Sequence, residues 1–309
     1  MTSRPELPPP RPSGPTGRQR AVAARTQGTI LRRRVVNGFM AGVVAIAALI
    51  TTLPLIFILV HLMKQGAAAV SSDFFTHMPK PPGEGGGGMA NAIVGTLILI
   101  AVACGIGLPI GIGAGLYLAD FRGSRLATAV RFLADVLNGV PSIVIGIFAW
   151  EFLVSPLGHF SALAGGVALA AMMVPMVTRT TEEMVRLVPT SLREAALALG
   201  YSRARTAIQV VLRTATAGIV TGVLVAVARI AGETAPLLFT SFGNQFWSLH
   251  LDQPIAALPL QIFTYAISAY DEWHAQAWAG ALVLITLVFV ISVAARFATR
   301  ARFTAGAHD

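Results

Sequence analysis

Six long apolar runs constrain this sequence more than any other feature. Each run has the length that a helix needs to cross about 30 Å of hydrocarbon. The chain is 55% hydrophobic and only 12% charged, whereas soluble domains carry about 25% charged residues. The sequence therefore predicts an all-α integral membrane protein with six transmembrane helices. The runs cover residues 38–63, 92–119, 126–153, 157–177, 215–238 and 277–293.

The segments around these runs have distinct compositions. Residues 1–37 are rich in Pro, Gly and Arg, which predicts a disordered tail. The first transmembrane helix, 38–63, is followed by an outer loop, 64–90, which contains the flexible string PPGEGGGG. We expect residues 91–298 to form the membrane core and residues 299–309 to form a second tail. Within the core, the outer stretch PIAALPLQIFTYAIS predicts a short helix.

The basic residues predict the orientation of the chain. With the N-terminus in the cytosol, 19 of the 23 basic residues fall in inner segments, as the positive-inside rule requires. Only Lys64 and Lys80 lie outside, and Arg131 and Arg229 lie within the runs. Both termini are therefore predicted to be cytosolic. Because the basic residues flank apolar runs without interleaved aromatic residues, nucleic-acid binding is not expected.

Two pairs of opposite charges lie in or beside the apolar runs. Arg229 and Glu233 are four residues apart in VAVARIAGETAPLL, and Arg179 and Glu182 are three apart in TRTTEE. A charge at mid-membrane costs about 2.5–3.5 kcal/mol, and such groups usually face a bundle interior and mark a solute path. The first pair could instead lock two helices together, and the second could be a solvated helix end.

The remaining polar residues and the proline in these runs predict structural features rather than a catalytic or metal site. Pro141 invites a kink in the third run, either at a gate or simply around neighbouring helices. Asp135 follows Arg131 by four residues, so a structural pair is expected. An intramembrane enzyme would need Asp135, Glu151 or Glu233, but no nucleophile–base pairing supports one. Three histidines have no metal-ligand partners at useful spacing: His61, His77 and His250.

The longest inner loop contains the signals of a short helix followed by a second one. Ser191 and Glu194 have the spacing of a capping box, so a helix is expected from Leu192. Gly200 suits a left-handed helix end, and Ser202 can cap a second helix that runs into the fifth apolar run.

An apolar face on the short helix requires a partner. The helix of about eight residues is shorter than the roughly 12–15 residues that an isolated helix needs in water. It could tuck against the inner ends of its own spans, or dock on another protein. The face consists of Leu192, Ala195, Ala196 and Leu199.

The string EAALALG in this loop resembles the EAA motif of type I ABC importer permeases. The resemblance implies that the loop 190–213 holds a coupling helix that docks on an ATP-binding subunit. Arg213 stands where that family has Pro, which implies a less rigid exit from the coupling helix. The matching residues are Glu194, Ala195, Ala196 and Gly200.

Further strings resemble the PstA-type permeases of the high-affinity phosphate importer. They are NAIVGTL from Asn91, NGVPSIVIGIFAW from Asn138, TRTTEEM from Thr178, ARIAGETAPLLFT from Ala228 and QPIAALPLQI from Gln253. The resemblance implies the type I permease fold and identifies Arg179, Glu182 and Arg229 as charged positions of phosphate passage. Glu233 would hold Arg229 or accept a hydrogen bond from a protonated phosphate.

The resemblance also implies an assembly in a prokaryotic plasma membrane. Its parts would be a PstC-type second permease, two PstB-type ATP-binding subunits and an extracytoplasmic PstS-type phosphate-binding protein. This chain has no GxxxxGK[ST] string, so ATP and Mg²⁺ are expected on the partner ATPase and no cofactor on this chain. The alternatives are a permease for another oxyanion, such as sulfate or molybdate, and a membrane scaffold for phosphate-status signalling.

Overall fold

The computed structural model describes residues 17–84, 86–121 and 123–305, with side chains from residue 33 to residue 297 within those ranges. These residues form helices and one isolated β-bridge, Phe242–Ile255. The predicted all-α class is therefore confirmed. The chain divides into two units, Met1–His61 and Leu62–Asp309.

The first helix is longer than the sequence predicted. α1 runs over Gly17–Ala69, and its part from Arg33 is a candidate membrane span. The prediction of a disordered tail over 1–37 is wrong for 17–37, and residues 1–16 lie outside the described residues. The string RQRAVAARTQ contains residues of high helix propensity. Adding them to an existing helix avoids the unfavourable nucleation step.

Five helices in the described residues are long and apolar enough to cross a membrane, and a bent pair of shorter helices makes a sixth crossing if it counts as one. The predicted six spans agree with that count. The five are Arg33–Ala69, Ala90–Asp120 (α3), Ala162–Arg186 (α7), Arg203–Ala231 (α9 to α10) and Asp271–Phe297 within α13.

The third apolar run is broken rather than kinked. The helix axis bends by 106° between its two limbs. Pro141 precedes the second limb and has no N–H to continue the helix. The predicted kink at Pro141 is thus a complete break. The limbs comprise α4 (Arg125–Gly139), α5 (Ser142–Ala149), the π-helical segment η1 (Trp150–Val154) and α6 (Ser155–Leu157).

Helix boundaries elsewhere also differ from the predicted ones. α10 (Leu212–Ala231) ends seven residues before the predicted end of the fifth run, and the short α11 (Ala235–Thr240) follows. The short outer helix is confirmed as α12 (Leu258–Ala266). The predicted tail 299–309 is helical through the end of α13 (Asp271–Ala305), because the apolar helix extends into it, and residues 306–309 lie outside the described residues. The outer loop includes α2 (Ser72–Thr76).

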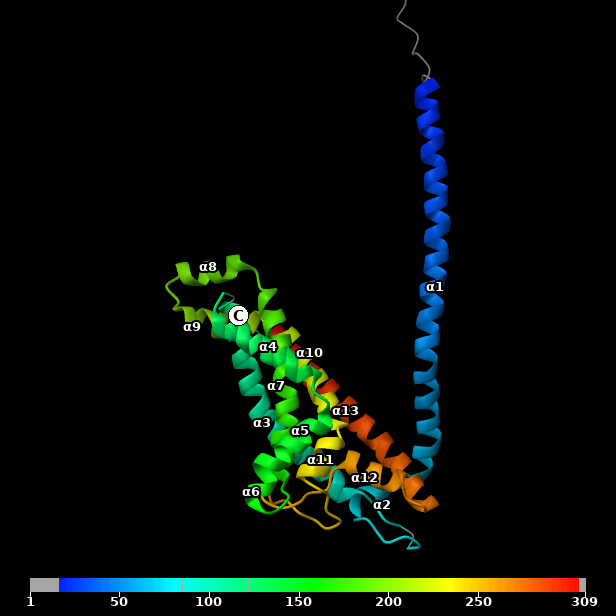
Figure 1. Cartoon of the computed structure of the whole chain (residues 1–309), viewed down its shortest axis with the longest axis vertical. Coiled ribbons are helices and arrows are strands. Elements are labelled where there is room, and N and C mark those ends of the chain that lie inside the picture. The colour runs from blue at the N-terminus through cyan, green and yellow to red at the C-terminus, as the bar shows by residue number, and fades with distance from the viewer. Residues whose placement is uncertain (1–16, 85, 122, 306–309) are drawn as a thin grey trace, which may run out of the picture. The chain divides into compact units, whose positions relative to one another are not determined.

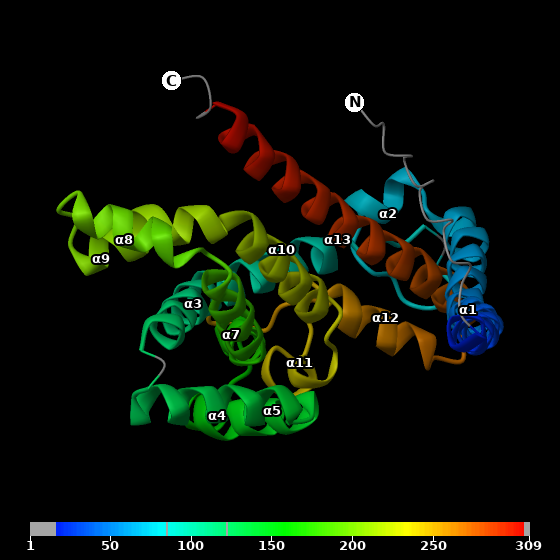
Figure 2. The same cartoon turned by 90° about the horizontal axis from the view of Figure 1, so that it is seen from above.

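Close packing on α7 organises the larger unit. Seen from above in Figure 2, α4 and α5 lie on one side of α7, and α3 and α10 pack on it elsewhere. On α3, Gly107, Gly111 and Gly115 recur every four residues. A Cβ atom at Gly115 would lie 2.5 Å from Cβ of Thr181. Glycine is therefore required for α3 to approach α7 this closely.

α10 also packs on α7 through glycines. A Cβ atom at Gly222 would lie 2.0 Å from the methyl group of Thr180. One turn earlier, a Cβ atom at Gly218 would lie 2.3 Å from the sulfur of Met184. α3 and α10 thus both pack on α7 through glycines, which carry only a hydrogen atom in place of a side chain.

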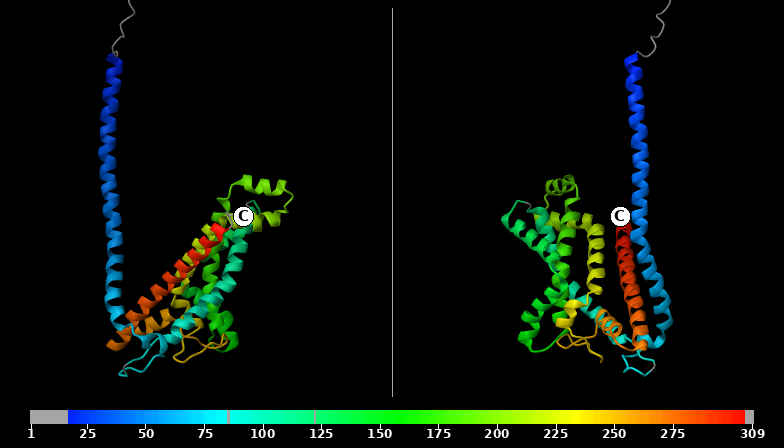
Figure 3. Two further views of the ribbon diagram at one scale, coloured as in Figure 1. Left: turned by 180° about the vertical axis from the view of Figure 1, so that it is seen from behind. Right: turned by 45° about the vertical axis from the view of Figure 1, so that its right-hand side comes forward.

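The connections of the larger unit gather at its two ends. Figure 1 shows α8 (Thr190–Ala198) and α9 (Arg203–Arg205) at one end, with α6, α11 and α12 at the other. Both views in Figure 3 show α8 standing out from its end, which is also the end that α13 approaches. This end holds the predicted coupling loop.

The packing predicts that Gly115→Ala destabilises the protein by about 1–3 kcal/mol, because the added methyl group overpacks the α3–α7 contact. Gly113→Ala, two residues away on the same helix, is the matched control, since its Cβ atom would meet nothing within 4 Å. We expect this control to be neutral or slightly stabilising. Thermal unfolding of the purified full chain in detergent measures both. Equal midpoints for the two variants would contradict the packing argument.

Candidate functional site

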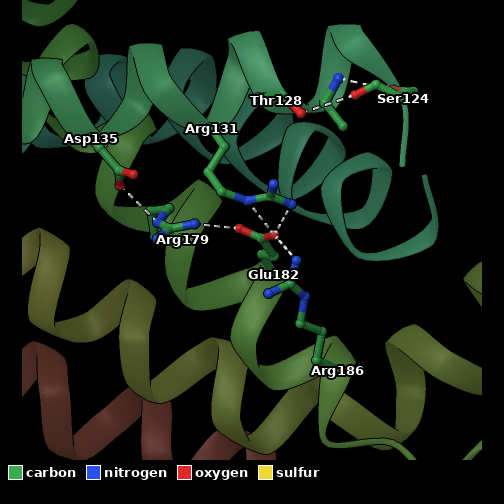
Figure 4. A network of polar contacts seen from close by, with 8 residues as sticks. Ser124, Thr128, Arg131, Asp135, Arg179, Glu182 and Arg186 are labelled. Atoms are coloured by element: carbon green, nitrogen blue, oxygen red, sulfur yellow. Dashed lines mark hydrogen bonds and ion pairs between the residues drawn. The ribbon is translucent and has the colours of Figure 1, made fainter. Parts of the chain in front are cut away.

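A buried carboxylate with three arginine partners is the strongest electrostatic feature of the chain. The side chain of Glu182 on α7 is fully buried. Arg131 of α4 donates to its Oε1 atom from Nε at 3.0 Å and from Nη2 at 2.6 Å. Arg179 donates to Oε2 from Nη1 at 2.8 Å, and Arg186 pairs with Oε1 (Figure 4). Burial of a carboxylate is tolerated here because both of its oxygens are paired with guanidinium groups.

A second carboxylate completes the cluster from the other helix. Oδ1 of Asp135 on α4 lies 3.0 Å from Nε of Arg179 (Figure 4). The predicted pair of Arg131 with Asp135 is therefore wrong. Both side chains reach across to α7, because α4 packs on the α7 face that carries Arg179 and Glu182. With three arginines and two carboxylates, the cluster has a formal charge of +1.

The sequence of α7 places these groups on one face. Arg179, Glu182 and Arg186 are separated by three and four residues, which is the spacing of neighbours on a helix surface. The helix continues to Arg186, beyond the predicted end of the apolar run at residue 177. The prediction that Arg179 and Glu182 share a face near the end of this span is confirmed.

The other predicted pair is looser than expected. α10 ends at Ala231, so Glu233 lies in the non-helical link to α11 and not on the helix of Arg229. Nε of Arg229 lies 3.9 Å from Oε1 of Glu233, and half of the arginine side chain is exposed. The pair therefore joins a helix to its own following link. It does not lock two helices together.

Arg229 also approaches the face of α7 that leads to the cluster. Its Nη1 atom lies 3.8 Å from the sulfur of Met176. Met176 precedes Arg179 by three residues, less than one helical turn, or about 4.5 Å along the axis. The two predicted charged pairs thus lie close to one another along α7. A guanidinium that contacts a thioether and one loose carboxylate keeps most of its donors available.

The coupling loop folds as a helical hairpin. α8 begins after Pro189 without a side-chain cap, so the predicted capping box of Ser191 and Glu194 is wrong. The rigid φ of Pro189 starts the helix instead. The predicted end is confirmed: Gly200 has φ +86° and donates to the carbonyl of Leu197. Tyr201 donates to the carbonyl of Ala196, which completes a Schellman motif.

The second half of the hairpin also matches the sequence. Ser202 accepts a hydrogen bond from the backbone N–H of Arg205 at 3.3 Å, as its predicted capping function requires. One continuous helix then extends over Arg203–Ala231, through the π-helical segment η2 (Thr206–Val211). Arg213, where the resembled family has Pro, lies inside this helix, so the exit from the loop is helical and unbroken.

α8 is fixed at one point and open along its apolar face. Arg193 pairs with Asp120 at the end of α3 and donates to the carbonyl of Val185 at 3.2 Å. Leu192 and Leu199 are nevertheless exposed, Leu199 by 80%. Ala196 on the same face is buried, and α8 contacts η2, so the hairpin is partly tucked against its own span while Leu192 and Leu199 stay exposed. The open face is available to another protein.

Three arginines at this end were not identified from the sequence as parts of a site: Arg131, Arg186 and Arg193. The spacing of Arg186 from Glu182 could have revealed it, since four residues bring both onto one helical face. Arg131 and Arg193 make contacts between helices 51 and 73 residues apart in sequence. No local pattern contains that information.

The remaining candidates do not form a second site. Asp135 is paired with Arg179, while Glu151 lies on η1 and Glu233 in the link after α10. Within the described residues, no group of three His, Cys, Asp or Glu side chains could hold a metal ion.

The fold agrees with that of known transport proteins. Residues 107–303 match the family described as "Binding-protein-dependent transport system inner membrane component". A subunit of the MetNI methionine ABC transporter in an inward-facing conformation has the same fold, with a TM-score of 0.56 and 20% sequence identity. That similarity covers 69% of this chain and 96% of the transporter chain. The chain is therefore a multi-pass inner membrane permease subunit of an ABC transporter, which works with partner subunits and is not itself the ATPase.

Three relatives with higher sequence identity show which family of permeases the chain belongs to. "Phosphate transport system permease protein PstA" of Yersinia pestis is 50% identical over 243 residues, which cover 78% of this chain and 82% of the relative. The protein of the same name from Xylella fastidiosa is 46% identical, over 89% of this chain and 96% of the relative. PstA 1 of Mycobacterium tuberculosis is 37% identical, over 88% and 92%. The chain belongs to the PstA family of permease proteins.

Neutralising the buried carboxylate should destabilise the protein. With Glu182→Gln, three guanidiniums converge on an uncharged group, and we expect a loss of about 3–5 kcal/mol. The neighbouring Glu183→Gln is the matched control, because Glu183 is exposed and the described residues offer it no ion pair. Thermal unfolding at equal ionic strength measures both. If Glu182→Gln unfolds together with the control, the cluster contributes nothing to stability.

Proposed function

We propose that this chain is the membrane-spanning permease subunit of an ATP-driven importer of inorganic phosphate and forms half of its translocation pathway. The observation that carries the proposal is the excess of guanidinium groups along α7, where three arginines face two carboxylates and Arg229 approaches from α10. Such an arrangement suits an anion that must leave water. The names of the PstA relatives, which are phosphate transport proteins, point to the same substrate.

The residue types fit phosphate chemistry. A guanidinium presents a planar fork of donors that matches two phosphate oxygens, which a lysine ammonium does not. Arg229, half exposed and loosely paired, is the first contact that we propose. Arg179, which Glu182 orients from Oε2, is the second. Met176, which Arg229 contacts, precedes Arg179 on α7 by less than one helical turn, so an anion could pass from one arginine towards the other.

Glu233 favours phosphate over other oxyanions. Its carboxylate lies beside Arg229, with Oε1 3.9 Å from Nε. It can accept a hydrogen bond from a protonated phosphate, whereas it repels a fully ionised anion such as sulfate. A permease for sulfate or molybdate is therefore the less favoured alternative.

α8 provides the coupling to the ATPase. Its exposed apolar face suits a cleft on an ATP-binding subunit, and Glu194, Ala195, Ala196 and Gly200 define the helix and its end. We assign two PstB-type subunits to this docking, with ATP and Mg²⁺ on those subunits and no cofactor on this chain. A PstC-type permease would complete the pathway, and a PstS-type protein would deliver phosphate.

This assignment fixes the orientation. The end of the larger unit that carries α8 and α9 faces the cytosol, and the end that carries α12 faces the binding protein (Figure 1). We assign both termini to the cytosol from the distribution of the basic residues. ATP binding would then move α8 as a lever in an alternating-access cycle. The break at Pro141 supplies a joint between α4 and α5, where a gate can open without unwinding either helix.

Uptake of labelled phosphate at micromolar concentration tests the proposal in cells whose native copy is replaced by this chain. We expect Glu194→Ala to abolish uptake because α8 no longer couples, and Arg229→Ala to lower it at least tenfold. Excess sulfate should not compete. Glu183→Gln is the control for a neutralised acid, and equal membrane levels of all variants are verified first.

The outcomes separate the candidate functions. Loss of uptake with both substitutions supports a phosphate pathway through Arg229. Loss with Glu194→Ala alone preserves the importer and removes Arg229 from the pathway. Full uptake in both variants would favour a membrane scaffold that reports phosphate status without moving solute.

A further inference from the structure

We propose that Asp135 is a displaceable internal counter-anion, which occupies Arg179 until phosphate takes its place. The inference rests on the function proposed above and adds to it the residue that sets how tightly the second arginine holds its anion. The observation behind the inference is that Glu182 and Asp135, the two carboxylates of the cluster, are held with unequal firmness.

Arg179 is divided between two acids. Its Nη1 atom donates to Oε2 of Glu182 at 2.8 Å, and its Nε atom lies 3.0 Å from Oδ1 of Asp135 (Figure 4). An anion that binds side-on to a guanidinium needs Nε together with one Nη atom. The Nε edge is the one that Asp135 occupies, so phosphate can bind there only if Asp135 leaves.

The two acids differ in how firmly they are held. Glu182 is fully buried and pairs with three arginines. The side chain of Asp135 is 52% exposed, and in the described residues its one ion pair is with Arg179. Glu182 therefore stays as the fixed support of Arg179. Asp135 can rotate away from Arg179 about its χ1 angle without any backbone change.

The exchange keeps the charge of the cluster within narrow limits. With Asp135 in place the formal charge is +1, and without it the charge is +2. An arriving anion restores the lower value. When the anion moves on, Asp135 returns to Arg179. The site therefore does not bind phosphate too tightly for release. A carboxylate with a single, half-exposed ion pair is suited to this because such a pair is held more weakly than the buried one of Glu182.

Equilibrium binding of labelled inorganic phosphate to the purified, complete importer in lipid nanodiscs, without ATP and without the binding protein, tests the proposal. We expect Asp135→Asn to bind phosphate about twofold to fivefold more tightly, since the competitor is removed. Asp135→Glu keeps the carboxylate and should return towards the native affinity. Glu183→Gln removes an equal charge from the same region of α7 without touching Arg179, and it should bind as the native protein does.

Each result has one meaning. Tighter binding in Asp135→Asn alone, in assemblies of native size, supports displacement. An equal gain in Glu183→Gln would show a general effect of charge and overturn the proposal, as would unchanged or weaker binding in Asp135→Asn. Uptake by the native importer is measured alongside. If the native protein takes up phosphate while Asp135→Asn binds like the control, only this inference fails; if it takes up none, the proposed function fails as well.

Discussion

The burial of Glu182 is the interaction on which the rest of the membrane core depends. A carboxylate removed from water costs several kcal/mol unless it is well paired, and here the pairing comes from two helices. Arg179 and Arg186 belong to α7 itself, whereas Arg131 must come from α4. The position of α4 against α7 is therefore specified by charge and not only by apolar contact. The first limb of the broken span is fixed there, while the second limb, beyond Pro141, packs on α11 and α7 in a different direction.

Glycine supplies the complementary constraint on the other faces of α7. Three glycines of α3 and two of α10 allow backbone-level approach, so α7 has little freedom to move sideways relative to either helix. A helix held in this way can carry charged groups in fixed positions. The arginines of the site are consequently oriented before any anion arrives, and preorganised donors need not reorganise when charge appears.

The sequence predicted the parts of this structure that depend on the spacing of residues within a short segment. Apolar runs of sufficient length indicated the number of spans, and Gly200 and Ser202 indicated the end of α8 and the start of the next helix. Arg179 and Glu182 were found because three residues separate them. The partner of Glu182 on α4 was not found, because a contact across 51 residues has no local signature. Likewise, the sequence placed Glu233 on a helix that ends two residues earlier, since the apolar run continues through the break.

A continuous set of contacts connects α8, the proposed coupling helix, to the proposed anion site. Arg193 ties α8 to Asp120 at the end of α3, and the glycine face of α3 packs on the part of α7 that bears Arg179. A displacement of α8 by a docked ATPase must therefore be shared by α3 or break the Arg193 pair. Because α3 packs on α7 at close range through Gly115, a displacement of α3 is expected to be felt by α7 as well. The weakest bond that then opposes a change at the site is the half-exposed pair between Arg179 and Asp135.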